Sequence, residues 1–422
     1  MKLLGAKLDV DDLDPSFVHP ADSNQKIHVV LDVCHMLKLV RNTLATQKII
    51  TDGNFGNIRW ELIEELHKIQ DEEGLRLGNR LRGAHIQWAK QKMKVNFAAQ
   101  TISESVADAI EFCDLVLEIP ALHDSAPTVK FIRIFDHLFD IFNSRNPYGK
   151  HYKSPLRESN KQAWQPFLTE AMQYISTLTD SCGTPMVKTK QKTGFLGFLV
   201  AIKRIECLFN KLVRNTNVSM TYLLTYKQSQ DHLELFFAAI RLSGGWNKNP
   251  TATQFMAAYK RLLLRHEVSA SGNCTALDAT NILHAVKDTT IINHVNADID
   301  VSDITTIRRY DLNVRLEPQQ TDHDYVDAPN FNYLSSYKEA AVGYIAGYVV
   351  RMVKRSVTCE SCIDALVEKD PNNTKFNSLV RQKNHGGLIE ASASVYQICD
   401  CLSNFISGLG RSCQEKCIFI SP

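Results

Sequence analysis

Two pairs of polar residues have the types and spacing that metal-assisted chemistry requires. Asp32 and His35 lie three residues apart, where a short apolar run passes into a helical pattern. Asp231 and Glu234 are also three residues apart, so both side chains would point the same way from one helix. Hard divalent cations prefer oxygen ligands, and two-metal nucleic-acid enzymes need two or three carboxylates from separate elements. Asp32 and Glu234 would meet that need if residues 33–233 form an insertion whose two ends come back together.

Both pairs also have a plainer structural interpretation. An Asp at a strand-to-helix junction commonly caps the helix, because its carboxylate accepts hydrogen bonds from the free N–H groups of the first turn. Asp231 fits the same role, with Glu234 as a solvated neighbour. Spacing alone does not decide between capping and metal binding.

A third set of residues has the groups needed to bind a nucleotide through side chains. The sequence contains no glycine-rich phosphate loop of the G-x-x-x-x-G-K-[ST] type. Lysines would then hold the phosphates, an aromatic ring would hold the base, and an aspartate would accept from the edge of a guanine. Salt bridges along helix faces are the alternative. The set comprises Arg80, His85, Lys94, Ser103, Phe139, Asp140 and Asn143.

More than half of the eleven cysteines form closely spaced pairs near the C-terminal end. The pairs are Cys359-x-x-Cys362, Cys399-x-Cys401 and Cys413-x-x-x-Cys417. Such pairs are typical of tetrahedral structural zinc sites. Their mutual spacing is irregular and no H-x-H follows, so a zinc site at the first pair and free thiols both remain open.

Apolar periodicity predicts the elements that must position these residues. Residues 1–27 are polar and acidic and are expected to form a loop. Residues 27–31 are a β-branched apolar run, which predicts a buried strand leading into a helix. Residues 47–220 show repeated helical patterns and almost no strand pattern, whereas residues 265–330 are polar and turn-rich. Further helices are expected around QSQDHLELFFAAIRL, TATQFMAAYKRLLLR and YKEAAVGYIAGYVVRMVKR.

The composition is that of an ordinary globular protein of two or three domains. Lys and Arg number 48 against 46 Asp and Glu, giving a net charge of +2, so any nucleic-acid surface must be local. Apolar residues make up 44% and charged residues 22%, which excludes collagen-like and largely disordered chains. No apolar run is long enough to cross a membrane, and the acidic N-terminal stretch does not follow the order of a signal peptide. The odd number of cysteines favours a reducing compartment, the nucleus or the cytosol.

Several long blocks, in the right order, resemble the P-element transposase family, whose animal relatives include the THAP-domain transposases. The blocks are LDVCHMLKLVRN, GLRLGNRLRGAHIQWAKQKMKVNFAAQTISESVADAI, FDHLFDIFNSRN, GFLGFLVAIKRI, QDHLELFFAAIRLSGGWNKNPTATQF and YIAGYVVRMVKR. The resemblance runs through nearly the whole chain.

The resemblance implies a ribonuclease H-like core, a mixed sheet flanked by helices, which a helical GTP-binding insertion interrupts. It assigns the second and third catalytic acids to Asp32 and Glu234, which would bind Mg²⁺, and places Asp231 near the magnesium. It also implies that GTP positions DNA rather than serving as fuel. Arg80 stands where the family has a lysine, which makes that contact doubtful. The implied nucleotide contacts are Lys94, Val95, Ser103, Phe139, Asp140 and Asn143, with Asp231 beside them.

The expected fold is therefore α+β and mostly α, with an incomplete ribonuclease H-like core and a helical C-terminal region. The expected divisions are residues 1–46 for the first part of the core, 47–220 for the GTP-binding insertion, 221–265 for the rest of the core, 266–335 for a polar linker and 336–422 for a helical, cysteine-rich region.

The 31 residues before Asp32 show no strand–hairpin–strand pattern, so the family's first catalytic Asp and its amino-terminal zinc finger are expected to be absent. Because a two-metal site that lacks one of three carboxylates loses a bridging ligand, we expect this chain alone not to cleave DNA. The expected function is that of a transposase fragment or domesticated derivative that binds GTP and DNA, either transposon ends or chromatin. It would act in the nucleus, as a homo-oligomer and away from membranes. The alternatives are an active transposase from an incomplete gene model and a non-enzymatic helical interaction module.

Basic residues of the insertion are candidates for contacts to the DNA backbone, with an ordinary solvated helix face as the alternative. They are Lys90, Lys92, Lys94, Arg204, Lys211 and Arg214.

Overall fold

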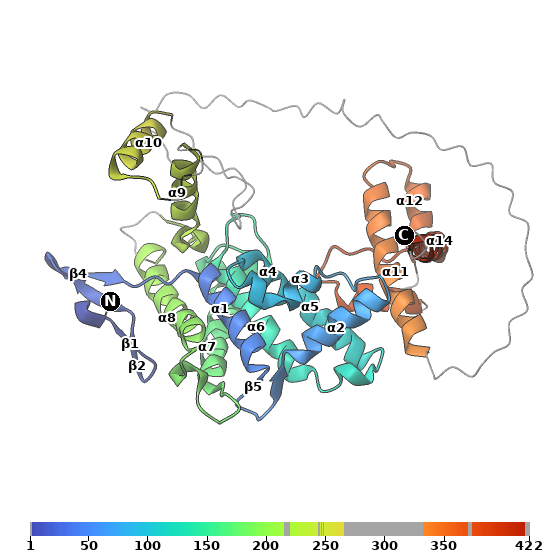
Figure 1. The fold of residues 1–422 in the computed structure, drawn as a ribbon, viewed down its shortest axis with the longest axis horizontal. Coiled ribbons are helices and arrows are strands. Elements are labelled where there is room, and N and C mark those ends of the chain that lie inside the picture. Colours follow the sequence, from blue (N-terminus) through green and yellow to red (C-terminus); the bar gives the residue numbers. More distant parts are fainter. Residues whose placement is uncertain are drawn as a thin grey trace, which may run out of the picture. The chain divides into compact units, whose positions relative to one another are not determined.

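The computed structural model describes residues 2–214, 220–243, 245, 247, 249–265, 332–369 and 374–417 (Figure 1). These residues fall into two compact units. The first comprises residues 2–234 and 332–417, and the second comprises residues 235–265. Both units are mainly helical.

The helices of the first unit agree with the helical patterns of the sequence. In chain order they are α1 (Val33–Gln47), α2 (Glu61–Glu72), α3 (Gly83–Ile86), α4 (Val95–Thr101), α5 (Glu104–Leu115), α6 (Ala126–Phe142), α7 (Lys161–Thr177), α8 (Thr193–Leu212), α11 (Asn332–Val353), α12 (Glu360–Leu366), α13 (Ser378–Gln382) and α14 (Ala393–Cys417). Helix α9 (Asp231–Ser243) begins in the first unit and continues into the second, where α10 (Ala252–Arg265) follows. The helices predicted around all three quoted segments are confirmed.

Helix α1 lies against α8, α6 and α4 near the centre of the first unit (Figure 1). Leu37, Val40 and Leu44 of this helix are fully buried, so one of its faces lies in the core. Close packing on α8 depends on two glycines. A Cβ at Gly197 would collide with Met36, and one at Gly194 would lie 3.0 Å from the backbone nitrogen of Val40.

Helices α5 and α6 form the other main helix pair of this unit. Four phenylalanines join α6 to α8, with the Phe135 ring centroid 4.7 Å from that of Phe131, 5.9 Å from that of Phe195 and 5.2 Å from that of Phe198. All four rings are fully buried. The amphipathic pattern FIRIFDHLFDIF therefore encodes one face of a continuous core.

The first 31 residues differ from the prediction. The expected loop contains two antiparallel hairpins, β1 (Lys7–Asp9) with β2 (Asp12–Asp14) and β3 (Ser16–His19) with β4 (Asp22–His28). The expected strand over residues 27–31 is wrong in its bounds, since β4 ends at His28. A two-stranded hairpin buries little, so its outer residues are polar and hide the strand pattern.

The block over residues 47–220 is not entirely helical. Strands β5 (Ile49–Thr51) and β6 (Asn57–Arg59) pair antiparallel, and only the central residue of each, Ile50 and Ile58, is buried. Three-residue strands are too short to show an alternating pattern. The described strands form three separate two-stranded sheets and not the mixed sheet implied by the resemblance.

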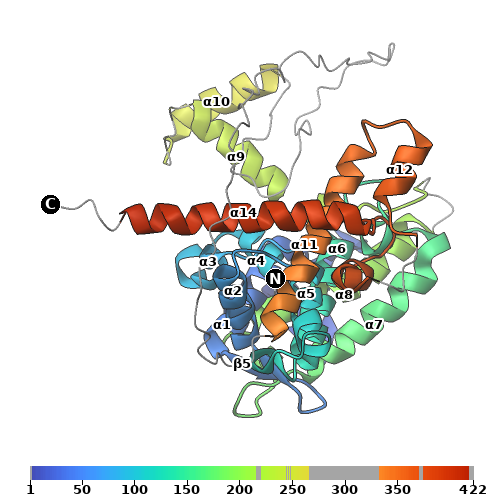
Figure 2. The ribbon, with the colours of Figure 1, turned by 90° about the vertical axis from the view of Figure 1, so that its right-hand side faces the viewer.

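In the C-terminal part of the first unit, α11 contacts both α13 and α14 (Figure 2). Two glycines of α11 allow close packing on the segments that flank α13. A Cβ at Gly343 would collide with the carbonyl of Phe376, and one at Gly347 with that of Ile389. The predicted linker, residues 266–335, lies outside the described residues except for the start of α11.

The second unit has a small apolar core of its own, in which Ile240 from α9 meets Ala258 and Leu262 from α10. Within the described part of the chain, no helix is long and apolar enough to cross a membrane.

Candidate functional site

The Asp32 carboxylate performs the capping role that its position allows. Its Oδ1 accepts from the backbone N–H of Cys34 at 3.1 Å, which caps α1. Its Oδ2 contacts Nδ1 of His35, one turn into the helix. The Asp32 side chain is 3% exposed, so both carboxylate oxygens are used within the chain.

The structure brings Glu234 to the other side of the same histidine. Its Oε1 lies 3.7 Å from Nε2 of His35, while Asp32 contacts Nδ1. The two predicted acids, some two hundred positions apart in sequence, therefore face opposite nitrogens of one imidazole ring. The Glu234 side chain is 48% exposed, which agrees with a solvated residue.

Asp231 is the first residue of α9 and pairs with Arg145, whose Nη2 lies 3.2 Å from its Oδ2. Burial raises the pKa of Asp231, and this outweighs the opposing effect of Arg145. The same Nη2 donates to Oδ1 of Asn143 at 3.0 Å. Arg145 thus brings together two residues of the predicted nucleotide set, although the sequence analysis did not single it out.

The fit of these acids to Mg²⁺ is poor in this arrangement. Asp32 is committed to an N–H group and to His35, and Asp231 to an arginine. Among the described residues, no group of three or more His, Cys, Asp or Glu side chains is placed to hold a metal ion. Octahedral Mg²⁺ requires several oxygen atoms that converge on it and are free to coordinate. Here N–H groups and basic side chains already bind the carboxylate oxygens.

Three of the predicted nucleotide residues lie at the starts of α4 and α5. Lys94 precedes α4 and is exposed, with its Nζ 5.1 Å from the centroid of the Phe97 ring, and Val95 is buried as the first residue of that helix. Ser103 precedes α5, and its Oγ donates to the carbonyl of Gln100 at 3.1 Å.

The loop before Lys94 is held by α1. Arg41 donates to the carbonyl of Gln91 at 3.1 Å, and Asn42 donates to that of Lys92 at 3.3 Å. Arg41 is fully buried. One helix therefore carries Asp32 at its start and supports the Lys94 loop about three turns later.

The remaining residues of the set lie at the end of α6. Phe139 is partly buried against the main core, and Asp140 lies 3.4 Å from Nζ of Lys153. Burial raises the pKa of Asp140 despite this lysine. Asn143 follows the helix and accepts from Arg145.

A cluster between α5 and α6, which we call the α5–α6 cluster, consists of Glu104, Asp136, His137 and Asp140. Oδ2 of Asp136 accepts from the backbone N–H of Glu104 at 3.0 Å, and Nε2 of His137 lies 3.4 Å from Oε1 of Glu104. Burial, with the neighbouring charge of Asp140, raises the pKa of Asp136 to about 7. Sequence reasoning missed Asp136 and Glu104, although Asp136 lies one turn before Asp140 on the same helix face.

His85 and Arg80 take ordinary structural positions. His85 is buried, with its Nε2 2.9 Å from Oε1 of Gln100, and burial lowers its pKa. Arg80 is exposed.

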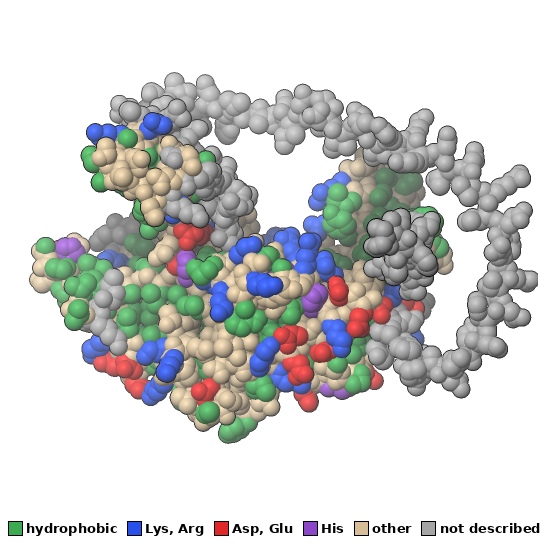
Figure 3. Space-filling view, in the orientation of Figure 1, with side chains coloured by type: hydrophobic (Ala, Val, Ile, Leu, Met, Phe, Trp, Pro, Cys, Tyr) green, Lys and Arg blue, Asp and Glu red, His purple; other side chains and the backbone are tan. Residues whose placement is uncertain are grey.

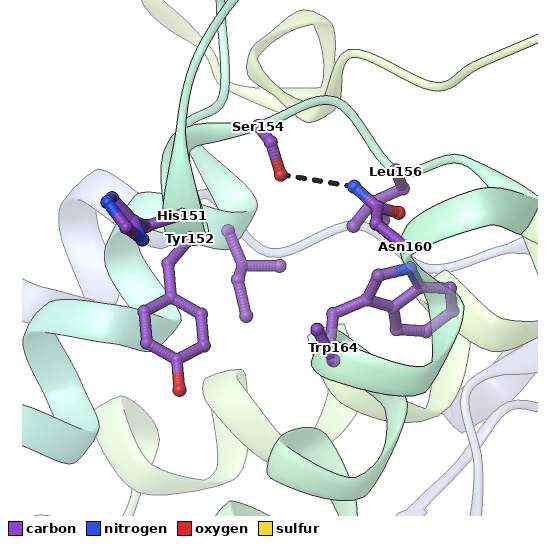
Figure 4. Close-up of a pocket in the computed structure, with 8 residues that line it drawn as sticks. His151, Tyr152, Ser154, Leu156, Asn160 and Trp164 are labelled. Atoms are coloured by element: carbon purple, nitrogen blue, oxygen red, sulfur yellow. Dashed lines mark hydrogen bonds between the residues drawn. The ribbon is translucent and has the colours of Figure 1, made fainter.

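A cavity of about 370 Å³ lies beside the α5–α6 cluster (Figure 4). Tyr152 joins the two, because its ring stacks on His137 with centroids 4.2 Å apart. Asn160 donates to Ser154 at 3.1 Å across one edge of the cavity, and Trp164 lines its wall. The buried indole N–H of Trp164 has no hydrogen-bond partner among the described residues. None of the predicted nucleotide residues lines this cavity.

The zinc prediction is not supported. Cys359 and Cys362 are exposed free thiols, and hydrogen bonds from the backbone and then the side chain of Cys362 lower the pKa of Cys359. Cys399 is partly buried against the α11–α14 core, whereas Cys401 is exposed, because residues two apart on a helix point in different directions. The side chains of Cys413 and Cys417 lie outside those described.

Basic side chains gather over the region of α3 and α4 (Figure 3). Of the DNA-contact candidates, Lys90, Lys92 and Lys94 are exposed there, and Lys211 and Arg214 are exposed at the end of α8. Arg204 is fully buried and bonded to Gln228, so it is neither a DNA contact nor part of a solvated helix face in this structure.

Three family models match the chain. The model described as "TNP-like, GTP-binding insertion domain" matches residues 34–155, and "TNP-like, RNase H C-terminal domain" matches residues 226–260. The model described as "DNA transposase THAP9, C-terminal domain" matches residues 333–418.

Two curated proteins are similar over almost the whole chain. Human DNA transposase THAP9 is 33% identical over 402 residues, which cover 94% of this chain and 44% of the human protein. The Transposable element P transposase of Drosophila melanogaster is 26% identical over 408 residues, covering 92% of this chain and 47% of that protein. This chain therefore spans about half the length of the relatives that it matches.

A solved structure, described as the Drosophila P element transposase strand transfer complex, is also similar. The TM-score is 0.52 at 26% identity, over 62% of this chain and 56% of that one.

Proposed function

Because the chain is homologous to the P-element-type transposases, we propose that it binds GTP through the domain over residues 34–155 and contacts DNA through basic side chains of that domain. The match of this segment to a GTP-binding insertion domain is the observation that carries the proposal. All the predicted nucleotide residues except Asp231 lie within it.

The site would be formed by the starts of α4 and α5 together with the end of α6, and the contacts of Glu104 with Asp136 and His137 support the part between α5 and α6. Lys94 is an exposed cation for phosphate, and Asp140 is a partly buried carboxylate whose pKa is raised by burial although Lys153 lies beside it. A guanine edge offers N–H donors to this carboxylate, whereas adenine offers a different pattern. We therefore expect a preference for GTP over ATP.

We also propose that the acids beside α1 do not cleave DNA in this arrangement. Asp32 and Glu234 face opposite nitrogens of His35, and Asp231 is paired with Arg145. The role that the geometry supports is binding, and a protein that contacts chromosomal DNA would work in the nucleus.

Titration of the chain with a fluorescent GTP analogue tests the nucleotide site. We expect saturable binding at micromolar concentrations, at least tenfold weaker binding for Asp140→Ala, and weak competition by ATP. Asp71→Ala is the matched control, because Asp71 is an exposed carboxylate on α2 of the same domain. Equal affinities of the two variants would contradict the assignment of Asp140.

A non-enzymatic interaction module is the second candidate. One observation favours it: Ser103, Asp140 and Asn143 already have partners within the chain, namely Gln100, Lys153 and Arg145. No binding of the unaltered chain to GTP at high micromolar concentration would select this alternative.

A further inference from the structure

The C-terminal part of the first unit is anchored on the insertion domain by buried polar groups. The hydroxyl of Tyr337, on α11, donates to the carbonyl of Leu75 at 3.0 Å, and Tyr337 is fully buried. Lys383, which follows α13, donates from Nζ to the carbonyls of Leu77 at 3.0 Å and Ser105 at 2.9 Å. Because these donors would be costly to leave unpaired, the contact favours one docked arrangement.

Lys383 is an unusual anchor, because it is only 8% exposed and its bonded partners are uncharged carbonyls. Burial lowers its pKa to about 8, partly offset by the nearby carboxylates of Asp108 and Glu104. The side chain spans a gap between the loop before α3 and the first turn of α5. Undocking would break both of its hydrogen bonds together.

The first turn of α5 is the segment that carries Ser103, a predicted nucleotide contact. The hydroxyl groups of Ser103 and Ser105 lie 3.0 Å apart, and the Ser105 carbonyl receives Lys383. Glu104 lies between these two serines in the sequence. Its Oε1 is 3.4 Å from Nε2 of His137 and 3.6 Å from Nε2 of His385. Contacts from α6 and from the residues after α13 therefore converge on three consecutive residues.

A nucleotide that contacts both Ser103 and Asp140 needs α5 and α6 in one fixed relation, since Ser103 precedes α5 and Asp140 lies on α6. The contacts of Glu104 with Asp136 and His137 set that relation from the α6 side. Lys383 bonds to the Ser105 carbonyl of the same turn, and His385 contacts the same Glu104 oxygen, Oε1, as His137 does. Docking of the C-terminal region and nucleotide binding thus restrict the same few backbone dihedrals.

We propose that Lys383 and His385 are positioning residues of the nucleotide site, so that docking of the C-terminal region on α5 and binding of GTP strengthen each other. The inference rests on the proposed function. By linkage, the factor by which docking raises GTP affinity equals the factor by which GTP stabilises docking.

The test compares full-length Lys383→Met with the control Lys354→Met, in which an exposed lysine of the same region is changed in the same way. We expect Lys383→Met to weaken binding of the fluorescent GTP analogue about tenfold, within the usual range of coupling between sites, and the control to leave it unchanged. Hydrogen exchange of residues 378–385 should slow when GTP is added to the unaltered chain by a similar factor. A purely structural lysine would not make this exchange depend on GTP.

His385→Ala keeps the test decisive if Lys383→Met does not fold, because His385 is more than half exposed and its loss is mild. We expect a two- to fivefold weakening of GTP binding from this variant. If exchange shows that α13 is released while GTP affinity is unchanged, the inference is overturned and the proposed function stands. If the unaltered chain does not bind GTP, both fall.

Discussion

The carboxylates beside α1 and those between α5 and α6 lie in different electrostatic surroundings. Asp32 and Asp231 each have a close basic partner, His35 and Arg145, within the chain. In the α5–α6 cluster, Glu104 and Asp140 also have basic partners, His137 and Lys153. Among the described residues, the hydrogen bond to Asp136 comes from a backbone N–H, and burial raises the pKa of Asp136 to about 7. An acid that already has a bonded basic partner gains less from a ligand than one, such as Asp136, that has none. The comparison favours α5–α6 as the ligand-binding region.

The largest expected effect concerns how much the ion pairs of each region contribute to the free energy of unfolding. Arg133 on α6 donates to Glu111 and to the buried Asp108 on α5, so Arg133→Met leaves two carboxylates without this partner. We expect a loss of about 3 kcal/mol in the free energy of unfolding, measured with denaturant. Arg145→Met leaves mainly Asp231 without its partner, and it should lower the free energy of unfolding by less, about 2 kcal/mol. A larger loss for Arg145→Met would contradict the expectation that a residue serving two carboxylates contributes more than one serving mainly Asp231.

The next effect depends on pH. The folded-state pKa of Asp136 is raised from 3.8 to about 7, so the folded chain binds a proton more tightly than the unfolded chain. Its contribution to stability is therefore present at low pH, falls between pH 4 and 7, and stays low above that window. Asp136→Asn keeps an oxygen for the N–H of Glu104 and carries no charge. We expect it to be more stable than the unaltered chain by about 2 kcal/mol at pH 8 and equal to it below pH 4.

Thermal unfolding across this pH range distinguishes the two curves. If the difference between Asp136→Asn and the unaltered chain does not change with pH, the carboxylate is not under-compensated and the contrast between the regions fails.

The smallest effects sharpen the comparison within the region beside α1. Asp32→Ala removes the cap of α1 and should cost about 1 kcal/mol. Glu234→Gln changes a half-exposed side chain at the edge of the same cluster and should alter stability by less than about 0.5 kcal/mol. Denaturant unfolding measures both substitutions. If they lower the free energy of unfolding equally, the two acids take part in one shared interaction and do not have separate roles.

The sequence predicted the helices well, because long amphipathic patterns such as that of α6 bury a continuous stripe. It failed for short elements. The β5–β6 hairpin buries only Ile50 and Ile58, and the hairpins before α1 have polar outer strands, so neither leaves a pattern of useful length.

The candidate sites were predictable in part. The approach of Asp32 and Glu234 to one histidine agrees with a looped-out insertion, although their roles stay a prediction. Arg145, Asp136 and Lys383 were not predicted, because a buried ion pair or a lysine bonded to carbonyls depends on tertiary contacts between distant segments. Arg204 shows the converse difficulty, since a basic residue in a helical pattern was expected at the surface, as a DNA contact or on a solvated face, and is buried.

Helix α1 spans the distance between Asp32 and the residues Arg41 and Asn42, which hold the Lys94 loop. Each residue of an α-helix advances the chain by about 1.5 Å and turns it by about 100°. Deleting or inserting one residue between these points would swing the acid away from Glu234 or pull the loop off its carbonyl contacts. Changes in the length of this helix are therefore incompatible with the architecture.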